Sequence, residues 1–569
     1  IKDDVKDIPS RRFDMDSKMW LVHVNQNSFE SMKALAEKWG FTITEKANEA
    51  LTLAKIKGEE RVGMSKALAA RNANQFDFSD IELKPMDHQI AALEYAIDTI
   101  SNNRGLLIAD EQGLGKTSES LLIAKHFKAN KIVVVCPKSL KSNWRKEIKM
   151  WCPALSTFIV DAKNKKDHDE MMKYDVIVTH YDTIRDVRED PTSNSPSTKF
   201  YAEAGSLLYF LMNDFNPTAV IVDESHRIAS YKSLQSRGVK MLMRRRKIRM
   251  CLTGTPVVNK PQDLISQLTA LGQLESLGGF YYFRERYCGI KEGVWGDGTP
   301  RNLQELHSKL GATCFLRRLK KDVLTSLPPK MYSRVVIEID NRKEYNKAEN
   351  NLEDYLRGEG YDENRIASST NNERLTRIEH LKQLAAKGKL DAAIDWIRSF
   401  VEAGTKIVVF AHHVAIQRAI YDAFPNQAAK IASQGEMGIS DSKYADEIEK
   451  EKHKFQTDPD CLVMVASLKT GQEGHTLTAA SNVVFVEFGW TPKDHAQSAD
   501  RLHRIGQQNS VMVWWLEAEE TIEQDIIDIL QKKQHIVNGV VDGQEDRVSQ
   551  EYTKSIFGEL VKRIEAKKK

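Results

Sequence analysis

Short, continuous apolar runs recur along the first half of the chain and alternate with longer amphipathic stretches. These runs are GLLIA from Gly105, IVVVC from Ile132, VIVT from Val176, AVIVDE from Ala219 and MCLTGT from Met250. A strand that is apolar on both faces is typical of a parallel sheet covered by helices on both sides. The pattern therefore predicts an α/β lobe built on a mainly parallel sheet.

The second half of the chain repeats this pattern. Its apolar runs are YSRVVIEI from Tyr332, KIVVFA from Lys406, CLVMVA from Cys461, NVVFVEF from Asn482 and VMVWW from Val511. Helical stretches such as Tyr444 to Phe455 separate them, so we expect a second α/β lobe. The charged segment between the lobes, from Asn341 to Lys389, is predicted to be helical with one loop at Gly358 to Asn372. Near the C-terminus one helical face carries Ile522, Ile526, Ile529 and Leu530, and it is predicted to pack on the second lobe.

The N-terminal residues predict a small α+β unit. Met19 to Val24 is predicted to form a strand, a helix with a capping box at Asn27 follows, and FTIT from Phe41 is predicted to form another strand. The expected domains are a small unit at 1–45, a helical linker at 46–80, a first lobe at 81–316, a linker and helical protrusion at 317–400, a second lobe at 401–545 and a helical tail at 546–569.

Composition narrows the class of protein. The 569 residues are 41% hydrophobic and 29% charged, which is typical of a globular protein. No apolar run approaches the roughly 20 residues that span a bilayer, and the six cysteines form no C-x-x-C pair. We therefore expect an intracellular protein in a reducing compartment, cytoplasmic or nuclear, without a zinc site or a disulfide framework.

The net charge of +3 means that binding to nucleic acid would depend on local basic patches. Two runs are candidates, one made of Arg244, Arg245, Arg246, Lys247 and Arg249 and the other of Arg317, Arg318, Lys320 and Lys321. The alternative for each run is a solvated helix face.

The stretch GLLIADEQGLGKT, from Gly105 to Thr117, predicts a strand, a phosphate loop and the start of a helix. Gly113 and Gly115 allow a tight turn that brings amide hydrogens and a helix N-terminus to phosphate oxygens. Lys116 would supply a positive charge and Thr117 a hydroxyl for magnesium. Asp110 stands where the common motif has glycine, so a chance glycine turn is the alternative at this point.

Two further strand ends of the first lobe carry polar side chains. Asp223 and Glu224 follow a buried strand, where carboxylates are costly unless they hold a metal or activate water. In a phosphate-loop enzyme the first acid holds magnesium and the second can polarise the attacking water. LTGTP follows the next strand, and its hydroxyls on Thr253 and Thr255 suit a segment that couples nucleotide state to a second site.

The second lobe contains two segments suited to phosphate chemistry. ASLKTGQEGHTLTAA, from Ala466 to Ala480, offers glycines and hydroxyls that can approach a sugar-phosphate backbone. In QSADRLHRIGQ, Arg501 and Arg504 are spaced to share one helical face. The two arginines could form a structural ion-pair site, or they could be fingers that reach the transferred phosphoryl group.

DEQGLGKT, DESH, LTGTP, FLRRLKKDV, KTGQEGHTLTAA and QSADRLHRIGQ, in this order, resemble the Swi/Snf family of superfamily-two helicase-like ATPases. The resemblance covers Lys84 to about Lys533, and the family's loop begins with an acid at the position of Asp110. It implies an α/β fold with two RecA-like lobes that close on ATP and Mg²⁺, and duplex DNA lying across the cleft. Hydrolysis would then drive translocation without processive strand separation.

The resemblance also implies roles for individual residues. Gln89 would contact adenine, Gly113, Gly115, Lys116 and Thr117 would hold the phosphates and magnesium, Asp223 and Glu224 would form the hydrolytic centre, and Arg501 and Arg504 would be the fingers. DNA contact or coupling between the lobes would fall to the segments of Pro137, Ser139, Tyr181, Thr253, Thr255, Thr470 and Trp490.

Within the family, the DESH form and the LPPK ending of the linker are most similar to the annealing helicases and fork remodellers. VKDIPSRRFDMDSKMWLVHV resembles their HepA-related (HARP) domain without its opening strand. The sequence therefore predicts an ATP-dependent translocase that anneals or remodels branched DNA. Two alternatives remain: a DNA-binding scaffold with a vestigial ATPase, and the motor of a larger defence, transcription-recycling or chromatin-type complex.

Overall fold

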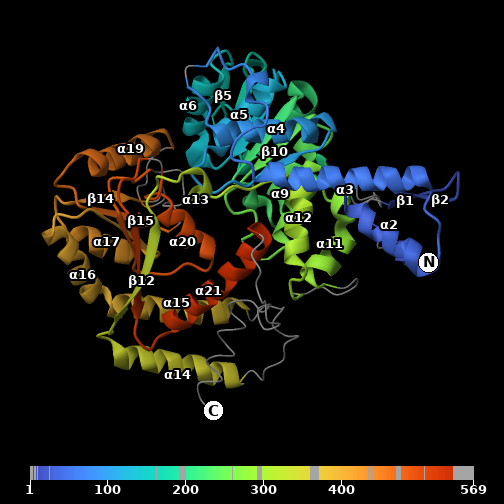
Figure 1. Cartoon of the computed structure of the whole chain (residues 1–569). Helices are drawn as coiled ribbons and strands as arrows, with labels where there is room; N and C mark the ends of the chain where they lie inside the picture. Colours follow the sequence, from blue (N-terminus) through green and yellow to red (C-terminus); the bar gives the residue numbers. More distant parts are fainter. Residues whose placement is uncertain are drawn as a thin grey trace. The chain divides into compact units, whose positions relative to one another are not determined.

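The structure is a computed structural model, and it describes residues 4–542 except 6, 7, 9, 10, 23, 25, 82, 162, 191–199, 259, 291–297, 359–370, 433–435, 437–440, 469–475 and 505. The described chain forms two compact units. The first comprises residues up to Val323 together with residues from Ile536, and the second runs from Leu324 to His535. Each unit contains one large sheet with helices around it (Figure 1).

The first unit is built on a seven-stranded parallel sheet. Its strands, in spatial order, are β11 (Phe315–Leu316), β3 (Leu106–Ile108), β10 (Ile248–Leu252), β9 (Ala219–Asp223), β4 (Ile132–Cys136), β6 (Val176–His180) and β5 (Thr157–Ile159). The five strands that the apolar runs predicted are confirmed. The edge strands β5 and β11 were not predicted, and both are too short to give a periodic signal.

Helices cover both faces of this sheet. They are α4 (Asp87–Ser101), α5 (Lys116–His126), α6 (Lys141–Trp151), α7 (His168–Met171), α8 (Leu207–Phe210), α9 (Leu234–Met243), α10 (Asp263–Leu271), α11 (Gly279–Cys288), α12 (Leu303–Thr313) and α13 (Lys320–Val323). A small antiparallel pair, β7 (Val187–Glu189) and β8 (Phe200–Ala202), lies beside α9. Apolar side chains of β3, β4, β9 and β10 are buried together with those of α4 and α5.

The second unit contains a six-stranded parallel sheet. Its spatial order is β12 (Lys330–Ile337), β17 (Val511–Ala518), β16 (Asn482–Phe485), β13 (Ile407–Ala411), β15 (Val463–Ser467) and β14 (Ala428–Ile431). The helices are α14 (Arg342–Gly358), α15 (Asn371–Gly388), α16 (Leu390–Glu402), α17 (Val414–Asp422), α19 (Asp441–Thr457), α20 (Pro492–Ala499) and α21 (Ile522–Val541). Separate apolar clusters cover the two faces of the sheet. The two-lobed α/β fold is thus confirmed.

The N-terminal unit differs from its expected order of strand, helix and strand. An antiparallel hairpin of β1 (Arg11–Asp14) and β2 (Met19–Val22) is followed by α2 (Gln26–Trp39) and α3 (Glu45–Ser65). The segment from Phe41 is not a strand, because Phe41 is 47% exposed and the residues before Glu45 only connect two helices. The strand β1, which precedes β2, was not predicted.

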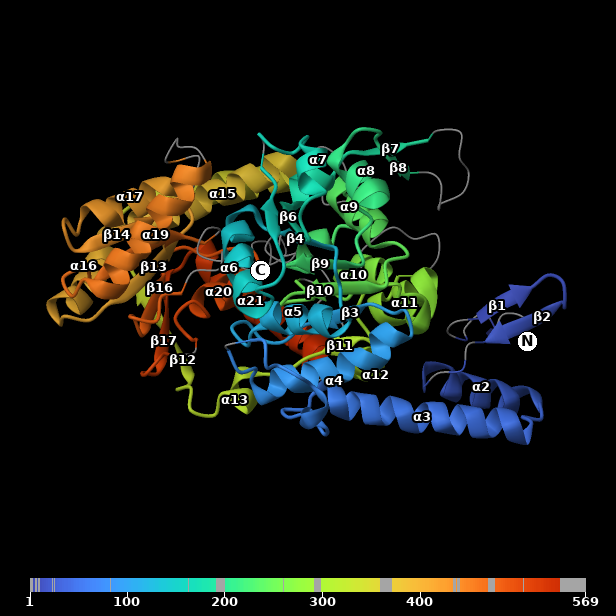
Figure 2. The ribbon, with the colours of Figure 1, turned by 90° about the horizontal axis from the view of Figure 1, so that it is seen from above.

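The expected linker after Glu45 is part of the first lobe. The Arg61 guanidinium of α3 donates to the Ala312 carbonyl at 2.9 Å and pairs with Asp98 of α4 at 2.6 Å. Figure 2 shows α3 lying alongside α4, with the hairpin near its far end. Because these contacts fix α3 to α4 and α12, the N-terminal unit is attached through a packed helix.

Some expected features fall outside the described residues, namely most of the loop from Gly358 to Asn372, Thr470, and the tail at 546–569. The helix expected near the C-terminus is confirmed as α21, in which Ile522, Ile526, Ile529 and Leu530 are all buried. Within the described part of the chain, no helix is both long and apolar enough to cross a membrane.

Candidate functional site

The phosphate loop, Asp110 to Thr117, connects β3 to α5 and leaves the N-terminus of that helix without a side-chain cap. Gly113 and Gly115 have φ angles of 91° and 89°, the left-handed region that glycine adopts without strain. A Cβ on Gly115 would also lie 2.4 Å from Gln89 Nε2. The loop therefore needs glycine for both its turn and its packing.

Lys116 points back into the loop. Its Nζ donates to the Asp110 carbonyl at 2.9 Å, and a Cβ added to Gly254 would lie 3.5 Å from the same ammonium nitrogen. Burial lowers the pKa of Lys116, while the negative charges of Glu224, Asp110, Glu119 and Asp223 act in the opposite direction. The ammonium thus lies in the field of several carboxylates, and Thr117 follows it as the second residue of α5.

Gln89 lies on α4 and is 5% exposed. Its Oε1 accepts from the Met86 amide at 2.9 Å, and its Nε2 donates to Ser118 Oγ at 2.9 Å. These bonds place its carboxamide directly behind the phosphate loop.

Asp223 and Glu224, which we call the acid pair, end strand β9. Asp223 Oδ2 accepts from Trp144 Nε1 and Oδ1 accepts from the Glu224 amide, both at 2.9 Å. Burial, followed by the charge of Glu224, raises the pKa of Asp223 to about 7. Glu224 has a φ of 52°, which is uncommon outside glycine and marks a position where the local fold holds the backbone under strain.

A chain of short contacts joins the acid pair to the segment after β10. His226 Nδ1 lies 3.2 Å from Glu224 Oε2 and 2.9 Å from Thr253 Oγ1, which in turn accepts from the Thr255 amide at 3.1 Å. Ser225 Oγ donates to Gln267 of α10 at 2.8 Å. The structure therefore brings together the DESH and LTGTP segments that the sequence predicted, and it adds His226 and Gln267 to them.

Asp110 belongs to a buried charge network that sequence reasoning missed. The Arg318 amide donates to Asp110 Oδ1 at 2.9 Å, and the Arg318 guanidinium pairs with Asp110 and with Glu119, the latter at 2.7 Å. Burial and the charge of Asp110 raise the pKa of Glu119 well above its usual value. One cation, the Arg318 guanidinium, therefore pairs with two carboxyl groups beneath the phosphate loop.

This network corrects the alternative proposed for the second basic run. Arg318 and Lys320 are each 2% exposed, so they do not form a solvated helix face. Arg317 Nη1 donates to the carbonyls of Ala109 at 2.8 Å and Gly254 at 3.2 Å. The run thus holds the phosphate loop and the LTGTP segment together. The spacing of residues within the run could not predict these contacts with distant segments.

Three of the residues expected along DNA lie at strand ends of the first lobe. Pro137 is buried and precedes a helical turn in which Ser139 is exposed. Tyr181 is 3% exposed, and its hydroxyl donates to the Asp223 carbonyl. Tyr181 therefore contacts the backbone of the acid pair, whereas Ser139 faces solvent.

Arg501 and Arg504 do not share a helical face, because α20 ends at Ala499. Arg501 is 1% exposed, while Arg504 is partly exposed and its guanidinium donates to Thr476 Oγ1 at 3.1 Å. Gln507 Nε2 donates to the Ala480 carbonyl at 2.8 Å, which ties the arginine segment to the residues before β16. The structure brings together the described ends of the two expected phosphate segments of the second unit.

Trp490 belongs to a polar cluster in the second unit. Its Nε1 donates to Glu379 at 2.8 Å, and the Lys382 ammonium lies 4.3 Å from the centre of its ring. Nearby, Glu487 accepts from the amides of His412 and His413, at 2.7 and 2.8 Å, and from the His413 ring. The hydrogen bond that the His413 ring donates to Glu487 raises the pKa of His413, and Glu487 has a lowered pKa although its burial acts in the opposite direction.

Both lobes match known domain families. Residues 88–388 match the SNF2-related domain, and residues 388–506 match the helicase conserved C-terminal domain. The first match encloses the phosphate loop, the acid pair and the LTGTP segment, and the second encloses both arginines of the second unit.

Curated relatives show the same similarity. The human DNA annealing helicase and endonuclease ZRANB3 is 31% identical over 80% of this chain and 40% of its own length. The Xenopus laevis SWI/SNF-related matrix-associated actin-dependent regulator of chromatin subfamily A-like protein 1 is 26% identical over 87% of this chain and 50% of its own length. The chain therefore spans half or less of these relatives.

Among solved structures, the Sulfolobus solfataricus SWI2/SNF2 ATPase core in complex with dsDNA aligns over 82% of this chain and 95% of that chain, with 23% identity and a TM-score of 0.37. The family assignment does not depend on this alignment. It follows from the SNF2-related match, which covers more than half of the residues and contains the linked phosphate loop and acid pair, so this chain belongs to the Swi/Snf family of helicase-like proteins.

Proposed function

We propose that this chain is a DNA-dependent ATPase that translocates on duplex DNA. The observation that carries the proposal is the contact chain within the first lobe. Arg317 donates to the carbonyls of Ala109, just before the phosphate loop, and of Gly254 in the LTGTP segment, and His226 joins that segment to the acid pair. A site that only bound nucleotide would not need a strained Glu224 at the end of a buried strand or a histidine that links it to a second segment.

The residues of the first lobe fit ATP and Mg²⁺. The uncapped N-terminus of α5 and the backbone of Gly113 and Gly115 suit phosphate oxygens. Burial and the charge of Glu224 raise the pKa of Asp223, and a divalent cation bound there would favour its ionised form. We assign Thr117 and Asp223 to the cation, Lys116 to the phosphates, Gln89 to the adenine side of the loop, and Glu224 to the orientation and deprotonation of the attacking water.

Arg504 and Arg501 are proposed to act on the same nucleotide when the lobes close. Arg504 is the better candidate for direct contact, because its side chain is partly exposed. Arg501 is fully buried, so its effect would include support of the fold. A positioned guanidinium of this kind typically contributes about 10³ to 10⁵ in rate.

Duplex DNA is proposed to lie along the strand ends that carry Ser139 and Tyr181, with Pro137 fixing the turn. Tyr181 also bonds to the backbone of Asp223, so a shift at the DNA side would reach the acid pair directly. Thr253, Thr255 and Trp490 are proposed to couple nucleotide state to DNA. Thr470 is proposed for the same role on the basis of the sequence alone, because it lies outside the described residues.

We further propose that the substrate is branched DNA, which the protein anneals or remodels. The relatives named as annealing helicases support this, and so does the N-terminal unit. Trp39 is 43% exposed, so it does not simply fill a small core, whereas Trp20 packs edge-on against Phe13 with ring centroids 5.1 Å apart. Exposed aromatic rings can stack on unpaired bases at a junction.

An ATPase assay of the whole chain with no DNA, single strands, blunt duplex and forked duplex tests the proposal. We expect a strong rise in turnover with duplex and a steep fall of that rise with salt, because contacts to phosphates release counterions. Equal turnover with and without DNA at low salt would contradict a translocase, and the complete absence of turnover would support the scaffold alternative. Full duplex stimulation without any fork annealing would favour the motor of a larger complex.

A further inference from the structure

A wide groove runs along α9 and α10 of the first unit, with a volume of about 1700 Å³. It extends from Tyr231, which precedes α9, to Arg244, Arg245 and Arg246, which follow it. The ten residues of α9 rise by about 15 Å. Small-molecule sites have volumes of roughly 300 to 1,000 Å³, so this groove suits an extended ligand better. We call it the α9 groove.

The α9 groove carries a large excess of positive charge. Its lining includes Arg237, Lys240, Arg244, Arg245, Arg246 and Arg249, against one described carboxylate, that of Asp263. It contains most of the first basic run of the sequence. The run follows the end of α9 and does not form a helix face: Arg244, Arg245 and Lys247 are exposed, Arg246 is partly buried and Arg249, in β10, is 9% exposed.

Several of these cations make their hydrogen bonds to neutral oxygens. Lys240 Nζ donates to the Tyr231 carbonyl at 2.8 Å, Arg246 Nη2 donates to the Met212 carbonyl at 2.7 Å, and Arg249 donates to the Asn103 carbonyl. Burial, followed by the charge of Arg237, lowers the pKa of Lys240 to about 8. Burial also lowers the pKa values of Arg246 and Arg249. The groove thus holds partly desolvated cations that an anionic ligand would stabilise.

Aromatic rings alternate with the cations. The Arg237 guanidinium lies 3.9 Å from the ring centre of Phe200, and the Lys240 ammonium lies 3.4 Å from that of Tyr231. Phe280 lies 5.6 Å from Tyr231, ring centre to ring centre, and also lines the groove. Tyr231 is 42% exposed. A cationic groove with stacking rings is the arrangement with which proteins hold single-stranded nucleic acid.

The α9 groove is distinct from the nucleotide site. The phosphate loop, the acid pair and Thr253 all follow the carboxyl ends of β3, β9 and β10. Arg244 to Arg246 and Asn103 instead precede β10 and β3, at the opposite edge of the same parallel sheet. The groove thus begins at Tyr231 and Lys260, which follow β9 and β10, and extends towards the edge of the sheet opposite the nucleotide site.

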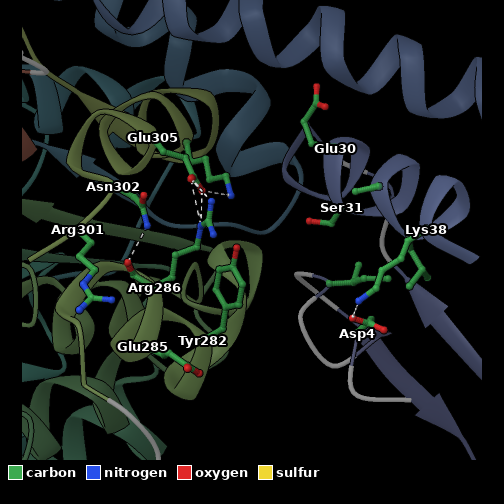
Figure 3. A pocket seen from close by; sticks show the side chains of 14 residues that line it. Asp4, Glu30, Ser31, Lys38, Tyr282, Glu285, Arg286, Arg301, Asn302 and Glu305 are labelled. Carbon is green, nitrogen blue, oxygen red and sulfur yellow. Dashed lines mark hydrogen bonds and ion pairs between the residues drawn. The ribbon is translucent and has the colours of Figure 1, made fainter. Parts of the chain in front are cut away.

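A second large pocket of this unit has no comparable excess of positive charge. The pocket between α2, α11 and α12 has a volume of about 800 Å³ (Figure 3). Its lining has four carboxylates and four cations, and several of them pair, since Glu305 contacts Arg286 and lies 2.7 Å from Lys309, and Lys38 lies 2.5 Å from Asp4. This pocket has little charge left for a phosphate backbone, in contrast to the α9 groove.

We propose that the α9 groove binds a single-stranded segment of nucleic acid, separate from the duplex on which the motor acts. Phosphates would lie against Arg237, Lys240 and Arg245, and bases would stack on Tyr231. The site itself does not depend on the proposed ATPase function, but its use in annealing rests on that function. A protein that anneals DNA would thereby hold one unpaired strand close to the lobe that hydrolyses ATP.

Binding of a fluorescent oligothymidylate to the whole chain without nucleotide is the direct test. In the variant R237Q/K240Q/R245Q, affinity at low salt should fall at least tenfold. The slope of log affinity against log salt should decrease by about 2, since each contact to a single strand contributes about 0.7. The control K57Q/K149Q/K173Q removes three exposed lysines from other parts of the unit and should bind as the wild type does.

Tyr231→Leu separates stacking from charge. It keeps an apolar side chain and leaves the backbone carbonyl that Lys240 uses, so its fold should be unchanged. Loss of one stacked base should weaken oligothymidylate binding roughly fivefold or more, with an unchanged salt slope. A photoreactive oligonucleotide containing bromodeoxyuridine should cross-link to the peptide that contains Tyr231.

Turnover on blunt duplex distinguishes this site from the motor, and both groove variants should retain it. Failure of the wild type to bind oligothymidylate at low salt, or equal binding by the triple variant and its control, would overturn the proposal. A parallel loss of duplex-stimulated turnover would also overturn it and assign the groove to the duplex path. A last outcome separates the two proposals. If no protein hydrolysed ATP but the binding differences persisted, the proposed ATPase function would be wrong and the proposed nucleic-acid site in the α9 groove would still be supported.

Discussion

Nδ1 of His226 lies 2.9 Å from the hydroxyl oxygen of Thr253 and 3.2 Å from a carboxylate oxygen of Glu224. One ring therefore contacts both the catalytic acid that we propose and the segment after the next strand. All three side chains are at least 85% buried, so water cannot replace a contact that is lost. A displacement of Thr253 should therefore also displace His226 and Glu224. The contact makes Thr253 the point at which coupling can be tested.

Thr253→Val should reduce DNA-stimulated turnover about tenfold, which corresponds to about 1.4 kcal/mol in the barrier. The substitution keeps the shape of the side chain and removes the partner of His226, while ATP binding should be retained. Thr269→Val on α10 is the matched control, because the Thr269 hydroxyl bonds only to the Ile265 carbonyl among the described contacts. Steady-state turnover and nucleotide binding measure the two effects, and a wild-type rate for Thr253→Val would remove this residue from the coupling path.

Glu224→Gln and Lys116→Ala should have different effects. Glu224→Gln removes the charge that acts on water but keeps the phosphate contacts, so ATP should bind normally and turnover should fall by at least 10³. Lys116→Ala removes a phosphate contact and should weaken ATP binding as well. Fluorescent nucleotide titration and phosphate release measure both properties. Residual turnover close to wild type in Glu224→Gln would show that another group activates the water.

Arg318→Met should destabilise the first lobe by about 3 to 5 kcal/mol, because it leaves the buried Asp110 carboxylate without its cation. Arg185→Met is the control, since Arg185 lies on the surface and pairs only loosely with Asp182 at 3.6 Å. Denaturant unfolding of both variants measures the difference. Similar midpoints for the two variants would mean that the Asp110 network contributes little to stability.

The His413 and Glu487 pair predicts a pH dependence of stability in the second unit. The raised pKa of His413 means that its contribution is full below its usual value of 6.5 and is lost as pH rises through the folded-state pKa. The lowered pKa of Glu487 means that its contribution is present above 4.5 and is lost as pH falls through the folded-state pKa. His413→Asn should therefore cost on the order of 1 kcal/mol between about pH 4.5 and 6.5, and less at pH 8.

Thermal unfolding at pH 5.5 and pH 8 measures this dependence. His453→Asn, at an exposed position of α19, is the control and should show the same small effect at both values. A cost for His413→Asn that does not decrease at pH 8 would show that the ring acts through packing and not through its charge.

Deletion of residues 1–44 should leave duplex-stimulated turnover largely intact and reduce annealing of forked DNA. The cut stops before α3, because Arg61 of that helix bonds to α4 and α12. A deletion of residues 1–75 would remove those contacts and should lower both activities, which makes it the structural control. Annealing must be compared at matched ATPase rates, and unchanged annealing after the shorter deletion would separate the N-terminal unit from branched DNA.

The sequence predicted the strands and the loops at their ends better than it predicted the connections between distant segments. Apolar runs such as that of β9 are long enough to identify a buried strand, and the residues that follow them identify the site. The pairing of Arg318 with Asp110 involves residues 208 positions apart, and no local period records such a contact. The separation of Arg501 from Arg504 was missed because α20 ends at Ala499, before the spacing of three can apply.

The α9 groove is a second feature that the sequence alone could not predict. The basic run was visible in the sequence, but the choice between a solvated face and a binding surface depends on burial. Arg249 points inward from β10, and Arg237 reaches the groove from α9. The rings of Phe200 and Phe280 come from opposite ends of this region of the chain, so only the folded lobe places them beside the cations.

The position of β11 has a consequence for the synthesis of the protein. Phe315 and Leu316 complete the edge of the first sheet against β3, and Arg318 follows directly. At about 5 to 20 residues per second, a ribosome needs about 10 to 40 s to make the 208 positions that separate Asp110 from Arg318. During that time β3 lacks its neighbour β11 and Asp110 lacks its cation, so the growing chain exposes an unpaired strand edge.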